Sequence, residues 1–344
     1  KRENFFHYLD ALAPEVRKKL DRDGNLRLSR FPKDENGDIS SRFIFFTLAN
    51  SSKEGIKKML GSVDRTKTIF NQGETTDFGQ GHGLYTFQSL CASIEKRPDF
   101  AELIELFIEY DALTTQFVEG CLNSALKNNS ENIDLLLRIA ANRALLPIGS
   151  GPTEIEEETF KANFTRSFNT AIVFKNSAAV KAIFALGINI TEKDISGSLP
   201  LHYAAAHSSP EIFNFVLEKS LEGKTDAEKK AFLDIRNPEG QLALHLACLS
   251  DNIEAVEELL RQGAEINCRN AEGKTALDAM VRKGSPLRIV ELLIKRGASL
   301  DNIDGSESNI LHNAIWGKNI EIFQVIAQKL SATKTPEQLQ EMLN

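Results

Sequence analysis

One short pattern recurs in the second half of this 344-residue chain. The stretches LPLHYAAA, LALHLACL and NILHNAIW begin at residues 199, 242 and 309, and TALDAMVR, at 275, has an aspartate in place of the histidine. The shared column consists of His202, His245, Asp278 and His312, whose members are 43, 33 and 34 residues apart. A fixed period in this range predicts a stack of similar units, each dependent on its neighbours for stability.

Each unit has the same internal order of signals. An Asx residue stands eight positions before the histidine column; these residues are Asp194, Asn237, Asn270 and Asp304. In the first three units a glycine follows three positions later, at Gly197, Gly240 and Gly273. Asx followed by Gly is turn chemistry. After the column come apolar residues spaced i, i+3, i+4, as in IEAVEELLRQGA, which is the pattern of a helix with one buried face. Each unit is therefore predicted to be a turn, a short helix, a loop and a longer helix.

The stretch Glu239 to Asn270, EGQLALHLACLSDNIEAVEELLRQGAEINCRN, resembles the ankyrin-repeat family. That resemblance implies an all-α solenoid of helix-turn-helix repeats joined by β-hairpin turns. We predict five repeats in 163–330, followed by a C-terminal cap; the repeats are 163–194, 195–237, 238–270, 271–304 and 305–330, and the cap is 331–344. The long second repeat contains a lysine-rich insertion, in which Thr225 and Asp226 predict the start of a short extra helix.

The region before these repeats has weaker signals. Residues 1–41 are predicted to form an N-terminal capping helix with a hairpin or linker, 42–145 to be degenerate ankyrin-like helical hairpins, and 146–162 to be a polar insertion. The stretches SSKEGIKKMLG and FAELIELFIEYDA have the pattern of second helices. Asn123 and Asn169 occupy the histidine column in two upstream units.

The histidines are predicted to be structural. A catalytic or metal-binding histidine has no reason to recur at the period of the repeat, whereas an architectural one does. The family resemblance implies that the imidazole bonds the backbone of adjoining turns and so connects successive hairpins. Asp278 and Asn169 can still offer hydrogen-bond acceptors, so we expect those connections to be altered rather than lost.

The resemblance also implies that another protein binds to a concave surface made by the turn tips and the outward positions of the first helices. The predicted contact residues are Ser196, Ser198, Glu239, Gln241, Glu272, Lys274, Ser306 and Ser308 at the tips, and His207, Leu249, Ser250, Arg282, Lys283 and Trp316 on the helices. Ala206 and Gly317 share these helix columns. Trp316, the only tryptophan, belongs to a residue type that is common among binding hot spots. The alternative is that it packs beneath the C-terminal cap.

Composition limits the other functions. The net charge is −7 with both signs interspersed, which argues against a nucleic-acid partner. No run of 18 apolar residues is present, so we expect no membrane insertion. Four widely spaced cysteines, without a CxxC pair, favour reduced thiols in a cytoplasmic protein over disulfides or zinc. We therefore expect no metal and no cofactor.

Two alternatives to a non-enzymatic adaptor concern the N-terminal region. The glycine-rich stretch at 79–83 contains His82 and precedes Cys91, which allows a Cys-dependent activity, although a surface loop is favoured. LAPEVRKKL, at residues 12–20, is similar to the opening of an F-box that recruits a ubiquitin ligase. Degenerate repeats with large insertions also resemble ankyrin effectors that bacteria secrete, which would place the protein in the host cytosol or nucleus.

Overall fold

The computed structural model describes residues 52–54, 56–57, 87–109, 115–142 and 154–343. These belong to two compact units that divide between Ser167 and Phe168, within helix α9 (Glu154–Val173). Among the described residues, no helix combines the length and the apolar character needed to cross a lipid bilayer. The predicted N-terminal cap, the F-box-like stretch and the glycine-rich stretch lie outside the described residues.

The first unit contains α5 (Phe87–Glu95), α6 (Phe100–Glu109), α7 (Thr115–Asn128) and α8 (Ile133–Ala141). Helix α7 packs against both α5 and α8. Helix α6 buries Phe100, Leu103, Ile104 and Phe107, an i, i+3, i+4, i+7 stripe that creates one apolar face. The ring of Phe107 meets that of Phe117 edge to face, with 5.4 Å between centroids. The helix expected from FAELIELFIEYDA therefore forms.

Two buried carboxylates in this unit have different surroundings. Glu95 accepts hydrogen bonds from the hydroxyls of Ser124 and Ser130 and from the amide of Asn132. These bonds connect α5 to α7 and to the start of α8. Glu119 is bonded by the amide of Asn123, and burial raises its pKa to about 7 despite the nearby charge of Arg166. At pH values between the usual pKa of a glutamate and about 7, Glu119 therefore holds a proton that an exposed glutamate would have lost.

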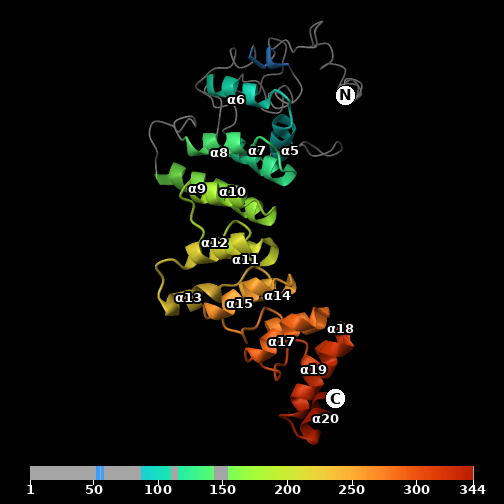
Figure 1. The fold of residues 1–344 in the computed structure, drawn as a ribbon. Coiled ribbons are helices and arrows are strands. Elements are labelled where there is room, and N and C mark those ends of the chain that lie inside the picture. Colours follow the sequence, from blue (N-terminus) through green and yellow to red (C-terminus); the bar gives the residue numbers. More distant parts are fainter. Residues whose placement is uncertain (1–51, 55, 58–86, 110–114, 143–153, 344) are drawn as a thin grey trace, which may run out of the picture. The chain divides into compact units, whose positions relative to one another are not determined.

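The second unit is a stack of helical pairs followed by a last helix (Figure 1). Its helices after α9 are α10 (Ser177–Phe184), α11 (Pro200–His207), α12 (Pro210–Leu221), α13 (Asp226–Leu233), α14 (Ala243–Leu249), α15 (Ile253–Arg261), α16 (Ala276–Lys283), α17 (Leu287–Lys295), α18 (Ile310–Gly317), α19 (Ile320–Ser331) and α20 (Pro336–Leu343). The first helices α11, α14, α16 and α18 pack in succession, and each packs against the second helix of its own repeat. The predicted all-α stack is confirmed.

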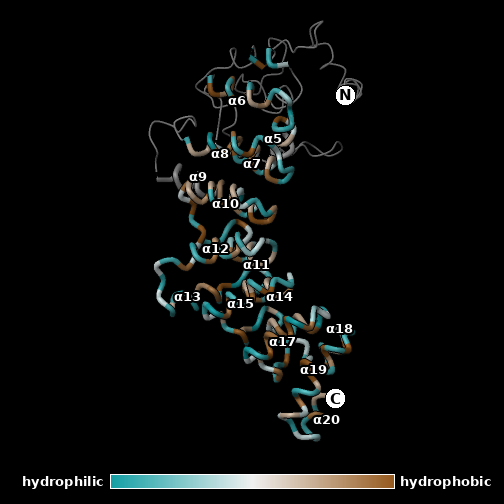
Figure 2. The backbone as a smooth tube through the Cα atoms, viewed as in Figure 1, coloured by the Kyte–Doolittle hydropathy of each residue, from teal (hydrophilic) through white to brown (hydrophobic). Residues whose placement is uncertain are grey.

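Side-chain caps define where these helices begin. Asn176, Asn252 and Asn319 each accept a backbone N–H in the first turn of α10, α15 and α19. Thr225 and Glu228 form a capping box at α13, so the short helix predicted in the insertion is present. Figure 2 shows polar and apolar residues interspersed along the helices, and the apolar ones of α15 include the buried Ala255, Val256 and Leu259.

Two features differ from the prediction: the start of α9 and the form of the turns. Helix α9 begins at Glu154, inside the segment 146–162 that was predicted to be a polar insertion. Its first turn is acidic, and acidic residues stabilise the N-terminus of a helix. The predicted β-hairpins are tight turns rather than ladders: in the described part of the chain the sole β-bridge joins Ile303 to Asn309. The Asx side chains compete with ladder formation because they bind the turn backbone themselves.

One turn geometry recurs at Asp194, Asn270 and Asp304, and the turn at Asn237 shares part of it. In the first, the Asp194 carboxylate accepts the backbone N–H groups of Ser196 and Ser198, and the Ser198 carbonyl accepts the N–H of Asp194. Asn270 and Asp304 make the same set of bonds in later turns. These bonds satisfy backbone groups that the chain reversal would otherwise leave unpaired, which explains the recurring Asx residue.

Glycine is required at position 240 for two reasons. Gly240 has φ of +70°, which a residue with a Cβ adopts only with strain. A Cβ on Gly240 would also lie about 2.5 Å from the Cβ of Ala271 in the next turn. Successive turns therefore approach each other too closely for a side chain.

Comparison of two glycines separates these effects. Gly263 has φ of +94°, but a Cβ added there would meet no heavy atom within 4 Å. Gly263→Ala is expected to lower the free energy of unfolding by about 1 kcal/mol, through backbone strain alone. Gly240→Ala adds the clash and should cost about 1–3 kcal/mol more. Chemical denaturation of both variants measures the difference, and equal losses would show that the turns can move apart.

The buried Glu119 predicts a pH dependence of stability. Because its pKa is about 7 in the folded state and about 4.3 when unfolded, folding favours the protonated form, and this benefit is lost as pH rises from about 4.5 to 7. Glu119→Gln mimics the neutral form. It should therefore raise the free energy of unfolding of the first unit by about 3 kcal/mol at pH 8, and by much less at pH 4.5. Urea denaturation at the two pH values measures this, and an equal effect at both would contradict the assignment.

Candidate protein-binding surface

The histidine column connects each first helix to the following turn. The backbone N–H of Leu199 donates to His202 Nδ1 at 3.0 Å, so the ring proton lies on Nε2, which donates to the carbonyl oxygen of Ile235 at 3.0 Å. His245 Nε2 makes the equivalent bond to the Lys274 carbonyl at 3.1 Å. Burial lowers the pKa of both imidazoles, which keeps them neutral. His202 thus bonds the end of its own repeat, just before the following turn, whereas His245 bridges repeats 238–270 and 271–304.

The same connection is made differently where the column is not histidine. Asn169 donates from Nδ2 to the carboxylate of Asp194 in the following turn, at 2.9 Å. Asp278 cannot donate when ionised, and the bond is reversed: Asn302, from beyond the next helix, donates to Asp278 Oδ2 and to the carbonyl of Gly273. Asn302 was not identified from the sequence, since it lies outside the repeated motif.

His312 departs from the prediction. Its Nδ1 accepts the N–H of Asn309 at 3.3 Å, but no bond from its ring to a following turn is present among the described residues. No further repeat follows α18 and α19 in the described chain. The contact to the cap comes instead from Asn309, whose amide donates to the carbonyl of Met342 in α20.

The predicted turn residues differ in their exposure. Ser196, Glu239, Glu272 and Ser306 are exposed, whereas Ser198, Gln241 and Ser308 are half-buried. Lys274 corrects the prediction because it is buried and its ammonium pairs with Glu272. The reason is the turn geometry: its N–H bonds Asn270 and its carbonyl accepts from His245, which draws the residue inward.

The first helices align a row of side chains near their C-terminal ends. This row, which we call the helix-end row, consists of Ala206, Leu249, Arg282 and Trp316. Trp316 is 66% exposed, so the alternative that it packs beneath the cap is wrong. The guanidinium carbon of Arg282 lies 5.3 Å from the centre of the Trp316 ring, and Arg282 Nη1 bonds Asn313 Oδ1 at 3.3 Å. Leu249 is half-buried.

The residue that follows each member of the helix-end row is exposed in three repeats and closely packed in the last one. His207, Ser250 and Lys283 are exposed, and the ammonium of Lys283 lies against the carbonyl of Leu249 and 3.6 Å from the carboxylate of Asp251. Gly317 packs against the Val281 carbonyl so closely that a Cβ would overlap it. This glycine sets the approach of α16 to α18 and is not free to bind a partner.

Comparison with known proteins identifies this architecture. The family model for ankyrin repeats matches residues 168–270 and 244–337. The chain belongs to the ankyrin-repeat family. Ankyrin repeats typically bind other proteins, and solenoids of this kind offer an extended surface for that purpose.

Several known proteins are similar to this chain over part of their length. The B-cell lymphoma 3 protein homolog of Mus musculus is 32% identical over 39% of this chain and 29% of its own. The nuclear factor NF-kappa-B p105 subunit of Rattus norvegicus is 22% identical over 62% and 23%, and the ankyrin repeat protein nuc-2 of Neurospora crassa is 26% identical over 41% and 16%. The chain therefore spans less than a third of the length of these relatives.

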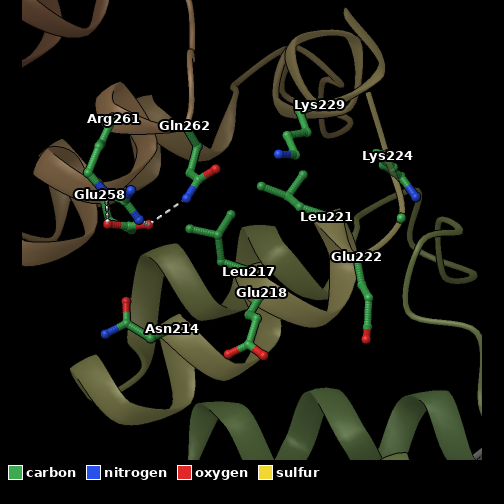
Figure 3. Close-up of a pocket in the computed structure, with 11 residues that line it drawn as sticks. Asn214, Leu217, Glu218, Leu221, Glu222, Lys224, Lys229, Glu258, Arg261 and Gln262 are labelled. Atoms are coloured by element: carbon green, nitrogen blue, oxygen red, sulfur yellow. Dashed lines mark hydrogen bonds and ion pairs between the residues drawn. The ribbon is translucent and has the colours of Figure 1, made fainter. Parts of the chain in front are cut away.

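The ankyrin repeats also contain a pocket on their second helices (Figure 3). A cavity of about 540 Å³ lies between α12, the insertion that holds α13, and α15. Leu217 and Leu221 lie between Lys229 on one side and the hydrogen-bonded Glu258, Arg261 and Gln262 on the other. Carboxylates and cations are equally numerous among the lining residues. The insertion thus adds surface to the ankyrin stack at a second place.

The cysteines of the described chain that were considered for chemistry are buried. Cys91 is fully buried in α5 of the first unit, and nucleophilic cysteines need access to substrate. Burial also raises the pKa of Cys121 and Cys248. Within the described residues, no group of three or more His, Cys, Asp or Glu side chains could hold a metal ion. His82, the partner considered for Cys91, lies outside the described residues.

The inter-repeat role of His245 can be separated from binding. His245→Ala removes the bond to the Lys274 carbonyl and leaves a cavity, so the free energy of unfolding should fall by about 2 kcal/mol. His207→Ala is the matched control, because His207 is exposed at the end of α11 and its loss should change stability by less than about 0.5 kcal/mol. Thermal and urea denaturation measure both. Equal effects would show that His245 does not connect the repeats.

Proposed function

We propose that this protein is a non-enzymatic adaptor whose ankyrin repeats hold a partner protein. The contact surface comprises the helix-end row with His207, Ser250 and Lys283, and the exposed turn residues Ser196, Glu239, Glu272 and Ser306. In an ankyrin solenoid these positions form the concave side, where first helices and turns converge.

The exposure of Trp316 carries the proposal. A tryptophan that is 66% exposed contributes little to the core and leaves a large apolar ring in water. Ile315 beside it is 56% exposed. Large aromatic residues surrounded by polar groups are typical of the centres of protein interfaces. The helix-end row therefore has the composition of a binding site and lacks that of a catalytic one.

The mixed charge of this surface indicates the kind of contact. Glu239 and Glu272 are at exposed turns, while Arg282 and Lys283 are at the helix ends. A partner with charges of both signs would be oriented by these two rows, since charge complementarity governs register and encounter rate more than affinity. Apolar contact with Leu249 and Trp316 would supply most of the free energy.

Substitution of the two apolar residues tests the proposal. The double variant Leu249→Arg, Trp316→Ala should weaken partner binding by at least about thirtyfold, which corresponds to a 2 kcal/mol hot-spot loss. The melting temperature should change little because neither side chain is in the core. Affinity capture with quantitative mass spectrometry, comparing wild type and variant, identifies the partner by its loss.

A matched control uses similar residues outside the surface. Leu260 is a half-buried leucine on α15, and Phe174 is a 48% exposed aromatic outside the helix-end row. Leu260→Arg with Phe174→Ala should leave the captured partner unchanged. A partner lost equally from both double variants, or a large drop in melting temperature for the first alone, would contradict the assigned surface.

A further inference from the structure

Arg282 is held in place before any partner binds. It lies in the helix-end row between Leu249 of the previous repeat and Trp316 of the next. Its guanidinium is within cation–π distance of the Trp316 ring, and its Nη1 bonds Asn313. Two groups from α18 thus fix the orientation of a side chain from α16. An arginine ordered in this way loses less conformational entropy on binding.

The guanidinium retains unused donors. An arginine has five N–H groups, and only the one bonded to Asn313 has a hydrogen-bond partner within the described residues. Arg282 is also exposed and has no ion pair in the described part of the chain. A planar, exposed guanidinium with free N–H groups matches the two oxygens of a carboxylate.

The neighbouring cation is already engaged. Lys283 bonds the carbonyl of Leu249 and lies 3.6 Å from the carboxylate of Asp251. Its charge is therefore partly offset by a residue of the protein itself. Arg282 is thus the cation of this surface that remains to be neutralised, with an apolar side chain on either side of it.

We propose that the helix-end row recognises an acidic peptide segment of the partner, with one carboxylate on Arg282 and apolar side chains on Leu249 and Trp316. The inference rests on the proposed function and specifies the chemistry of the partner. Adjacent helices pack about 8–10 Å apart, and an extended chain rises about 3.3 Å per residue. The acidic residue therefore lies roughly three positions from each apolar residue.

The surrounding charges favour a peptide over a nucleic acid. Asp251 lies beside Lys283, and Glu239 and Glu272 are exposed on the turns. A polyphosphate backbone running along the repeats would meet these carboxylates, whereas a peptide needs only one anionic group at Arg282. Phosphate binding also depends on several cations acting together.

The chain contains its own probe, because Trp316 is its only tryptophan. Random 12-residue peptides displayed on phage are selected against the immobilised full chain, and the enriched peptides are synthesised. Titration of each peptide is followed by tryptophan fluorescence. We expect enriched sequences with Asp or Glu between apolar residues, a shift in the Trp316 emission, and weaker binding at high salt.

Variants of Arg282 test the carboxylate contact. Arg282→Gln should weaken binding roughly tenfold to a hundredfold, the range for loss of a hydrogen bond to a charged group. Arg282→Lys keeps the charge but loses the planar fork, so it should restore only part of the affinity. Arg288→Gln, an exposed arginine on the second helix of the same repeat, is the matched control and should bind as the wild type does.

The outcomes distinguish this inference from the proposed function. Peptides without acidic residues, or acidic peptides that bind Arg282→Gln unchanged, would overturn the inference, as would equal binding of an oligothymidylate. If such peptides still required Leu249 and Trp316, the surface itself would stand. Selected peptides that are insensitive to all three residues would overturn both.

Discussion

The second unit depends on hydrogen bonds from the first helix of a repeat to residues at or just before the following turn. A pair of short helices buries only part of its apolar surface, and the remainder is covered by its neighbours. Apolar packing between helices is tolerant of small rotations, whereas a bond from His202 to the carbonyl of Ile235, or from His245 to that of Lys274, requires one register. These bonds therefore fix the position of each turn relative to the helix before it, and with it the alignment of the exposed rows.

Loss of the histidine does not remove this constraint. Asp278 accepts a hydrogen bond from Asn302, whereas a histidine in this column donates one. Asn169 donates, but its acceptor is the side chain of Asp194 rather than a backbone carbonyl. The partner atoms differ, but in each case a polar pair joins the first helix to a residue at or near the following turn. The replacement leaves some buried acceptors without a hydrogen bond: Asp278 Oδ1 and Asn302 Oδ1 have no partner among the described residues. Burial correspondingly raises the pKa of Asp278.

The sequence was sufficient to predict the architecture because the same signals recur at a regular spacing along the chain. The Asx and glycine columns predicted the turns, and i, i+3, i+4 spacing predicted the helices. Single residues were harder to predict where their environment depends on contacts between repeats. Lys274 occupies a tip column, yet its backbone bonds on both sides draw it inward. Gly317 occupies an outward column but is covered by Val281. The pairing of Arg282 with Trp316 involves adjacent members of one column, a relation that a linear motif does not reveal.

The last described helix packs against the last described repeat. Helix α20 packs on α18 and α19 and is bonded through the Met342 carbonyl to Asn309. Its outward residues are polar and include the exposed Glu337, Gln338 and Glu341. Helix α20 thus covers part of the last described repeat with a helix whose outer face is polar. A polar face of this kind does not offer the apolar complementarity that stacks one repeat on the next, so α20 is a poor surface for end-to-end contact with a second molecule.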